Sequence, residues 1–186
     1  MHCKFLIVLS DFATIFKQFL SQLLCTAIFS FEQRVITINP EEIIMSIVSE
    51  KGKEFGRLED FEIKLSNDSI IIMEEHFKYA VNEIIDNALS HINAGTVITL
   101  SSRIEKKRYY LYIMDYGSGF PEDYIIYDDP FKRKHILDFN RNNGGLGLAI
   151  VKKLLTLYNG SFNIESEAGF FTLVKIILPV KDEITN

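Results

Sequence analysis

The stretch from Phe77 to Ile92 constrains the fold most strongly, because its apolar residues recur at helical spacing. As a helix it has one apolar face, made of Phe77, Val81, Ile84, Ile85, Ala88, Leu89 and Ile92. The opposite face contains no lysine and is made of Glu83, Asp86, Asn87 and Ser90. Glu83 and Asn87 lie one turn apart, so their side chains point the same way. An acid beside an amide, with no basic partner nearby, suits a hydrated cation and a proton acceptor. The alternative is an ordinary half-exposed helix.

Net charge and cysteine content narrow the function classes. The chain has 186 residues and a net charge of -5, so it lacks the basic surface of a nucleic-acid-binding domain. Cys3 and Cys25 show neither zinc-ligand spacing nor a disulfide framework, which favours a reducing cytoplasm. The histidines are scattered along the chain, which argues against a histidine-built metal site.

Residues 5–31 are strongly apolar and suit either a membrane span or an amphipathic helix. Asp11 and Lys17 interrupt the run, and the uncharged residues 18–31 are fewer than the roughly 20 that a span needs. Polar residues also recur there at helical spacing. We therefore expect no membrane span but an amphipathic helix, through which the chain associates with a second copy of itself.

The rest of the chain mixes helical and strand patterns. Asn39 is expected to cap a helix that starts at Pro40, runs to about Lys51 and ends at Gly52. A later helix is expected over Leu146–Leu157. Strands are expected over residues 34–38, 61–65, 96–103, 108–115, 161–165 and 171–178. The pattern predicts an α+β fold in which helices cover one face of a mostly antiparallel sheet.

Three further stretches can carry chemistry, although each also suits an ordinary turn or a solvated charge run. Residues 115–119, DYGSG, place an acid at a strand end, followed by glycines that let a flat ligand come close. Residues 143–148, NGGLGL, open a helix whose first backbone N–H groups can bind an anion. Residues 128–134, DDPFKRK, put an aromatic side chain beside three cations in a long loop.

The order of these stretches resembles the Bergerat-fold ATPases, specifically the catalytic ATP-binding domain of sensor histidine kinases. The resemblance covers residues 39–179 and rests on NEIIDNA, DYGSG, DDPF, NGGLGLAIV and the closing hairpin YNGSFNIESEAGFFTLVKIILP. It implies a two-layer sandwich with a mixed sheet, preceded here by an N-terminal helix. It also implies ATP and Mg²⁺ as ligands.

The resemblance assigns roles at the phosphate end of the ligand. Asn87 would be the magnesium ligand, and Glu83 would assist phosphoryl transfer. Phe131 would anchor the lid, with Arg133 near the γ-phosphate. The phosphates would lie against the helix start formed by Gly145, Leu146, Gly147 and Leu148.

At the other end of the ligand, the resemblance makes Asp115 the residue that binds the adenine amine. Gly117 and Gly119 would lie beside the ring, with Thr172 supporting adenine binding. Two departures concern the phosphates: Ser90 stands where the family has a basic residue, and Asn143 replaces a glycine.

No phosphoacceptor histidine motif precedes the catalytic stretch, and residues 5–33 resemble a second dimerisation helix alone. We expect three parts: residues 1–38 as helix and linker strand, residues 39–181 as catalytic domain and residues 182–186 as tail. The resemblance implies a cytoplasmic kinase that transfers the γ-phosphoryl of ATP to a histidine on another chain or on a missing segment, with a response regulator or phosphoacceptor domain as partner. A nucleotide-binding module without catalysis and an anti-sigma-type serine kinase are the alternatives.

Overall fold

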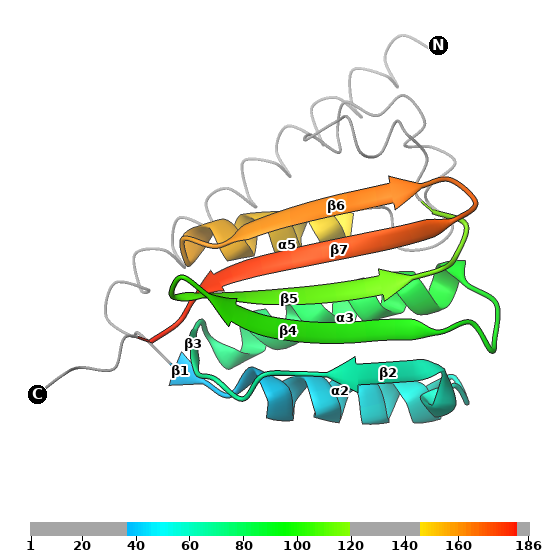
Figure 1. The fold of residues 1–186 in the computed structure, drawn as a ribbon, viewed down its shortest axis with the longest axis horizontal. Helices are drawn as coiled ribbons and strands as arrows, with labels where there is room; N and C mark the ends of the chain where they lie inside the picture. Colours follow the sequence, from blue (N-terminus) through cyan, green and yellow to red (C-terminus); the bar gives the residue numbers. More distant parts are fainter. Residues whose placement is uncertain (1–36, 120–145, 182–186) are drawn as a thin grey trace, which may run out of the picture. The chain divides into compact units, whose positions relative to one another are not determined.

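A five-stranded mixed sheet forms one layer of the structure, a computed structural model that describes residues 37–119 and 146–181 (Figure 1). β2 and β4 pair in parallel, and every other neighbouring pair in this sheet is antiparallel. The strand order is β2 (Phe61–Lys64), β4 (Ile98–Glu105), β5 (Arg108–Asp115), β7 (Phe171–Pro179) and β6 (Ser161–Glu167). A separate antiparallel pair joins β1 (Thr37–Ile38) to β3 (Ile70–Ile71).

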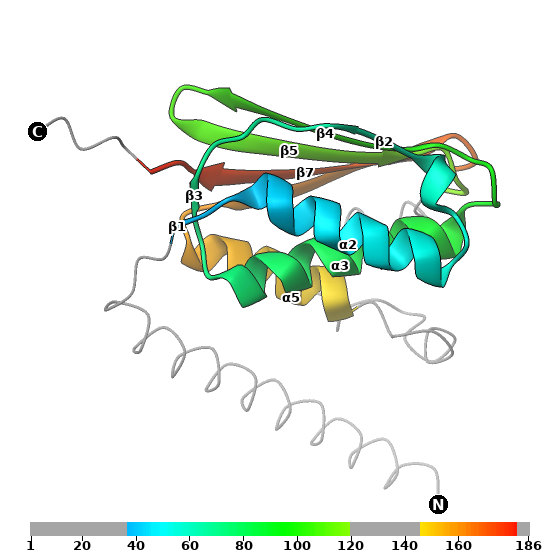
Figure 2. The same cartoon turned by 90° about the horizontal axis from the view of Figure 1, so that it is seen from below.

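Helices α2 (Pro40–Glu54), α3 (Glu74–His91) and α5 (Leu146–Leu157) form the second layer and cover one face of the sheet (Figure 2). Helix α3 packs against both other helices and against β5, so it is the central helix of the layer. The predicted α+β architecture, with helices over one face of a mostly antiparallel sheet, is therefore confirmed. None of the helices described within residues 37–119 and 146–181 has the length and apolar character to cross a membrane.

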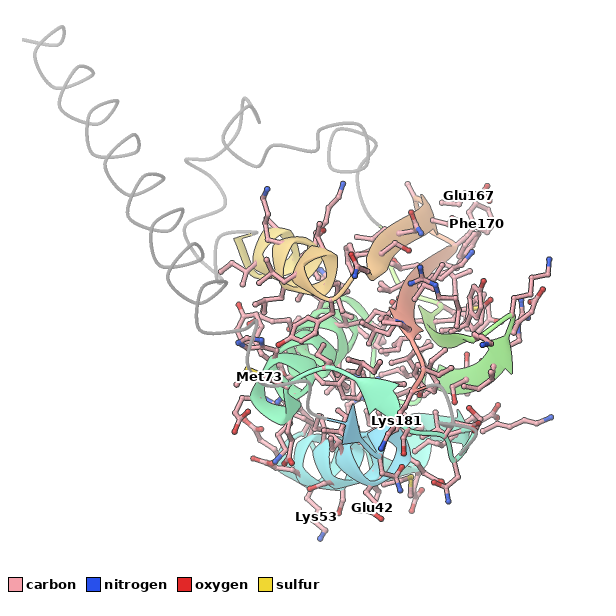
Figure 3. All side chains as sticks on the ribbon, turned by 90° about the vertical axis from the view of Figure 1, so that its left-hand side faces the viewer. Glu42, Lys53, Met73, Glu167, Phe170 and Lys181 are labelled. Carbon is pink, nitrogen blue, oxygen red and sulfur yellow. The ribbon has the colours of Figure 1, made fainter. Side chains whose placement is uncertain are left out.

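The core lies between the two layers, where Figure 3 shows side chains filling the space. Along β5, alternate residues are buried, so Tyr109, Leu111, Ile113 and Asp115 share the face that meets the helices. Phe77, Ile84 and Ile85 of α3 are essentially inaccessible to solvent. Because Asp115 continues the buried series, its carboxylate points towards the helices. The sheet therefore delivers one acid into the space beside α3.

Helix α2 does not end at Gly52, as the sequence pattern predicts, but continues to Glu54. A Cβ at position 52 would lie 2.8 Å from Leu58 Cδ1 and 2.9 Å from Leu58 Cα. Glycine is therefore needed there for close packing rather than for a left-handed cap. The left-handed residue is Gly56, with φ +63°.

Strand β4 is shifted along the chain from its predicted range of residues 96–103. The backbone N–H of Thr96 donates to the carbonyl of Asn93 at 3.2 Å, so Thr96 belongs to the preceding turn. At the other end Glu105 pairs with Arg108, leaving a loop of two residues whose φ angles are positive. Such loops match the twist of the strands that they join. The residues 34–36 of the first predicted strand, and the predicted helix of residues 5–31, lie outside the described residues.

A half-buried histidine ties the start of α3 to the end of α5. His76 Nδ1 lies 2.6 Å from the Tyr158 hydroxyl. Burial lowers the pKa of the His76 imidazole, although the charge of Glu75 acts in the opposite direction. Because the folded state holds this ring neutral, the unfolded chain takes up the proton first as the pH falls.

We therefore expect the contribution of His76 to stability to be greatest above the pKa of an unfolded histidine, about 6.5, and to fall as the pH drops below it. Thermal unfolding midpoints measured between about pH 8 and pH 5 should fall more steeply for the natural chain than for His76→Gln. Equal slopes for the two proteins would show that His76 does not contribute to the acid dependence.

Candidate functional site

The first turn of α5 lies directly against the polar face of α3. A Cβ at Gly147 would collide with the carboxylate of Glu83. Only glycine at position 147 allows this approach without displacing the acid. The glycine-rich helix start and the acid of the central helix, which are far apart in sequence, therefore meet in space. The N–H groups at Gly147 and Leu148 belong to the first turn of α5, where backbone donors have no partner within the helix.

Asn87 has its carboxamide orientation fixed by its own helix. Its Nδ2 donates to the backbone carbonyl of Glu83 at 2.8 Å. The amide oxygen is then the atom of this side chain that can ligate a cation. Among the described residues no cluster of three or more His, Cys, Asp or Glu side chains could hold a metal. One amide oxygen still fits Mg²⁺, which binds through one or two protein oxygens together with phosphates and water.

Glu83 is half-buried, and its environment controls its protonation. Burial raises the pKa of the Glu83 carboxyl, and the charge of Asp86 adds to the rise. A hydrogen bond from Tyr79 and the charge of Lys51 act in the opposite direction. Burial, followed by the charge of Glu83, raises the pKa of Tyr79 to about 12, so this phenol stays protonated and remains a donor. Glu83 is thus an acid that gains a proton more readily than an exposed glutamate.

The polar face of α3 does have a basic partner, contrary to the expectation from the sequence. Lys51 of α2 lies 2.8 Å from Asp86 Oδ1 and 3.1 Å from Asp86 Oδ2. It also lies 3.6 Å from Glu54. The partner comes from another helix, so the spacing of residues within α3 could not show it. The sequence pattern also did not indicate Tyr79 as a partner of Glu83, although its position four residues earlier places it on the same side of the helix.

Asp115 and Thr172 are direct neighbours on β5 and β7. Their exposed fractions are 6% and 4%. The backbone N–H of Gly117 donates to Asp115 Oδ1 at 3.0 Å, which leaves Oδ2 for another donor. Burial raises the pKa of the Asp115 carboxyl above the ordinary aspartate value, against the Gly117 hydrogen bond and the charge of His91. The Thr172 hydroxyl lies 3.4 Å from that of Ser166.

The glycines after Asp115 are required by close contacts. A Cβ at Gly117 would lie 2.5 Å from Ile92 Cγ2 and 2.7 Å from the His91 carbonyl oxygen. Gly119 has φ +69°, and a Cβ there would lie 2.6 Å from the Glu167 carbonyl oxygen. The residues 117–119, which we call the glycine turn, are therefore packed between the end of α3 and the β6–β7 hairpin.

Two backbone hydrogen bonds hold the glycine turn in that place. The N–H of Ser118 donates to the carbonyl of His91 at 3.3 Å. The carbonyl of Ser118 accepts from the N–H of Gly169 at 2.8 Å. Gly169 has φ +81° in the hairpin loop, whose outer edge is marked by Glu167 and Phe170 in Figure 3. The end of α3, the end of β5 and the hairpin loop therefore converge on one short turn.

Helix α3 connects the two halves of the site. Glu83, Asn87 and His91 follow each other at intervals of one helical turn, so the line from the first to the last is about 12 Å long. The Glu83 end contacts Gly147, and the His91 end holds the glycine turn beside Asp115. This arrangement can bind an elongated ligand with anionic groups and a cation at one end and a hydrogen-bond donor at the other. Gly145, Phe131 and Arg133 lie outside the described residues, as does the side chain of Leu146.

Comparison with known proteins gives a family match and a set of relatives. A family model described as "Histidine kinase-, DNA gyrase B-, and HSP90-like ATPase" matches residues 73–182, more than half of the chain. The signal transduction histidine-protein kinase ArlS of Staphylococcus aureus is 29% identical over 150 residues. The aligned region covers 80% of this chain and 33% of ArlS, so the chain spans about a third of the length of the curated relatives that it matches.

Solved structures show the same fold. The mycobacterial sensor histidine kinase MprB superposes with a TM-score of 0.67 at 22% identity, over 80% of this chain and 99% of that one. Full-length ShkA in complex with AMPPNP superposes with a TM-score of 0.61 at 18% identity, over 78% of this chain and 31% of that one. At these identities the likeness concerns the fold alone.

Proposed function

Since the chain belongs to the family of histidine kinase-, DNA gyrase B- and HSP90-like ATPases, we propose that it binds ATP with Mg²⁺ and transfers the γ-phosphoryl group to a histidine. The observation that carries this proposal is the line of contacts along α3. One end of that helix meets Gly147 at the start of α5, and the other holds the turn beside Asp115. The adenine amine donates to Asp115, and the phosphates lie along the polar face towards Gly147.

Each residue has a separate task in this proposal. Asn87 offers its amide oxygen to Mg²⁺, which would neutralise phosphate charge when bound. Backbone N–H groups at the start of α5 hold phosphate oxygens. A lone pair of the acceptor imidazole forms the new P–N bond while the γ-phosphorus parts from its bridging oxygen, and ADP leaves with that electron pair. The other ring nitrogen then releases its proton, for which Glu83 is the acceptor.

The partners follow from the same proposal. We expect the histidine on another chain or on a segment outside this sequence, and a response regulator as the next acceptor. Residues 5–33, outside the described part, would form a homodimer. A cytoplasmic location suits an enzyme that uses ATP.

Magnesium dependence provides the test. We expect a fluorescent ATP analogue to bind more tightly with Mg²⁺ than with EDTA, and Asn87→Ala to lose about tenfold in affinity with Mg²⁺ and little without it. Asn82→Ala is the matched control, because Asn82 is another half-buried amide of the same helix. Absence of binding by the natural chain at millimolar nucleotide would contradict the proposal.

A nucleotide-binding module without catalysis is the second candidate. The charge of Lys51 acts on Glu83, but this lysine is bound by Asp86 and Glu54 rather than left for a phosphate. Ser90, which is exposed on α3, supplies no positive charge either. Labelled ATP incubated with histidine-bearing acceptor domains separates the candidates. Acid-labile label on a histidine excludes the module without catalysis, whereas acid-stable label on a serine of a partner would favour the serine kinase.

A further inference from the structure

The guanidinium of Arg57, in the loop between α2 and the short helix η1 (Leu58–Asp60), is buried against the C-terminal end of α3. Its residue is 9% exposed. Nη1 donates to the carbonyls of Leu89 at 3.2 Å and Ile92 at 3.3 Å, and Nη2 donates to that of Asn93 at 2.9 Å. One side chain thus binds three carbonyl groups at the end of the central helix.

Asp60 completes the arrangement, and we call the pair the Arg57–Asp60 clamp. Arg57 Nε donates to Asp60 Oδ2 at 2.7 Å. The same oxygen accepts the backbone N–H of Gly95 at 3.0 Å. The clamp therefore holds both the last turn of α3 and the loop that leads from it to β4.

The end of α3 needs an external cap because it lacks one of its own. Its C-cap residue, Ile92, has φ −121° and ψ 152°, which is extended rather than left-handed. Helices that end with a left-handed glycine satisfy their last carbonyls with backbone N–H groups. Here the guanidinium satisfies carbonyls at this end, and its positive charge also complements the helix dipole.

The loop that carries Arg57 is itself fixed. The N–H of Arg57 donates to the carbonyl of Gly52 at 2.7 Å. The missing side chain at Gly52 allows Leu58 to pack directly on α2. Arg57 is therefore presented to α3 by a rigid corner, and burying a charge there is favourable only because its donors are satisfied.

The clamped carbonyls lie next to the contacts that hold the glycine turn. His91, whose carbonyl accepts the hydrogen bond of Ser118, lies in the chain between Leu89 and Ile92, whose carbonyls both accept from Arg57. Ile92, whose carbonyl binds Arg57, is also the residue against which Gly117 packs. A shift of this helix end would move the surface on which residues 117–119 rest.

We propose that Arg57 is a positioning residue for adenine recognition, which acts by fixing the end of α3 against the glycine turn beside Asp115. This inference rests on the proposed ATP-binding function. Arg57 touches no reacting atom, so its loss should weaken recognition of the base and spare the contacts near Gly147.

Amide exchange in the nucleotide-free full chain tests the structural link. In Arg57→Gln the Ser118 amide should exchange about tenfold faster, because the helix end that accepts its hydrogen bond is no longer held in place. Asp60→Asn should act in the same direction with a smaller effect. Arg108→Gln is the matched control: Arg108 donates to the carbonyl of Asn159 at 2.6 Å, after α5 and at the opposite end of β5. Unchanged exchange at Ser118 in both clamp variants would overturn the inference.

Base selectivity tests the functional link. Inosine triphosphate has a carbonyl in place of the adenine amine, so the natural chain should prefer ATP, and Arg57→Gln should reduce that preference about tenfold by weakening ATP alone. A merely destabilised protein would lose both nucleotides in the same proportion. If the natural chain prefers ATP and Arg57→Gln keeps the same preference, the inference fails while the proposed function stands. If the natural chain binds neither nucleotide, both fail.

Discussion

Asp115→Asn is expected to reverse the preference of the site from ATP to inosine triphosphate. In the natural chain, Oδ1 accepts from Gly117 and leaves a second carboxylate oxygen to accept from the adenine amine. In the variant the single amide oxygen stays with the Gly117 N–H, so the NH₂ group faces the ligand. Two donors then oppose each other when ATP binds, and we expect a loss of at least about a hundredfold in ATP affinity.

The same substitution should not destabilise the protein without nucleotide. The folded state raises the pKa of Asp115, mainly through burial. Its ionised form therefore opposes folding increasingly as the pH rises above the ordinary aspartate value. A neutral amide of the same shape removes that effect, so the unfolding free energy of Asp115→Asn near neutral pH should equal or exceed that of the natural chain.

Titration of both nucleotides and thermal unfolding on the same preparations check these expectations. Asp115→Ala is the control, since it removes the acceptor without adding a donor and should weaken ATP without favouring inosine triphosphate. Unchanged ATP affinity in Asp115→Asn would mean that the carboxylate does not contact the base. A lower melting temperature with unchanged selectivity would assign Asp115 a purely structural task.

Local patterns in the sequence were sufficient to predict the elements that carry the site. The helical spacing from Phe77 onward predicts α3, and the strand expected over residues 108–115 has the bounds of β5, whose last residue is Asp115. Both predictions depend on the spacing of residues within one helix or strand, so they need no knowledge of the segments that pack against it. The expected roles of the residues within the site stay predictions.

Features that depend on contacts between distant segments could not be predicted in this way. Lys51 meets Asp86 only because α2 packs beside α3, and Gly52 is explained by Leu58 folding back onto it. Arg57 caps a helix that ends more than thirty residues later, as its bond to Leu89 spans a separation of 32. A glycine or a basic residue in the sequence does not show which segment it will contact, because that partner is decided by tertiary packing.

Glu83→Gln is expected to slow phosphoryl transfer by orders of magnitude while leaving ATP binding intact. Glutamine keeps the shape that lies against Gly147 and retains an oxygen to accept the hydrogen bond from Tyr79. It cannot take a proton from the acceptor imidazole. Loss of a positioned general base typically reduces rates by about 10² to 10⁴, whereas ATP affinity should change by no more than about twofold.

The pH dependence of transfer in the natural chain gives a second readout. Burial raises the pKa of Glu83, and only its ionised form can accept a proton. The rate should therefore fall on the acid side with an apparent pKa above the ordinary glutamate value, and Glu83→Gln should lack this limb. Glu75→Gln is the matched control, because Glu75 is an exposed carboxylate in the first turn of the same helix.

The measurements are ADP formation and label transfer to a histidine-bearing acceptor domain, alongside nucleotide titration. The contacts of Tyr79 and Gly147 with position 83 depend on the shape of the side chain and not on its ability to take up a proton. The amide variant therefore keeps the position of the side chain and removes only the proton acceptor. Full transfer by Glu83→Gln would remove this residue from the reaction and leave it as packing for the start of α5. Loss of ATP binding in the same variant would instead mean that the negative charge at position 83 helps to order the cation beside Asn87. The charge would then act on the binding of ATP in the ground state rather than on the transfer step.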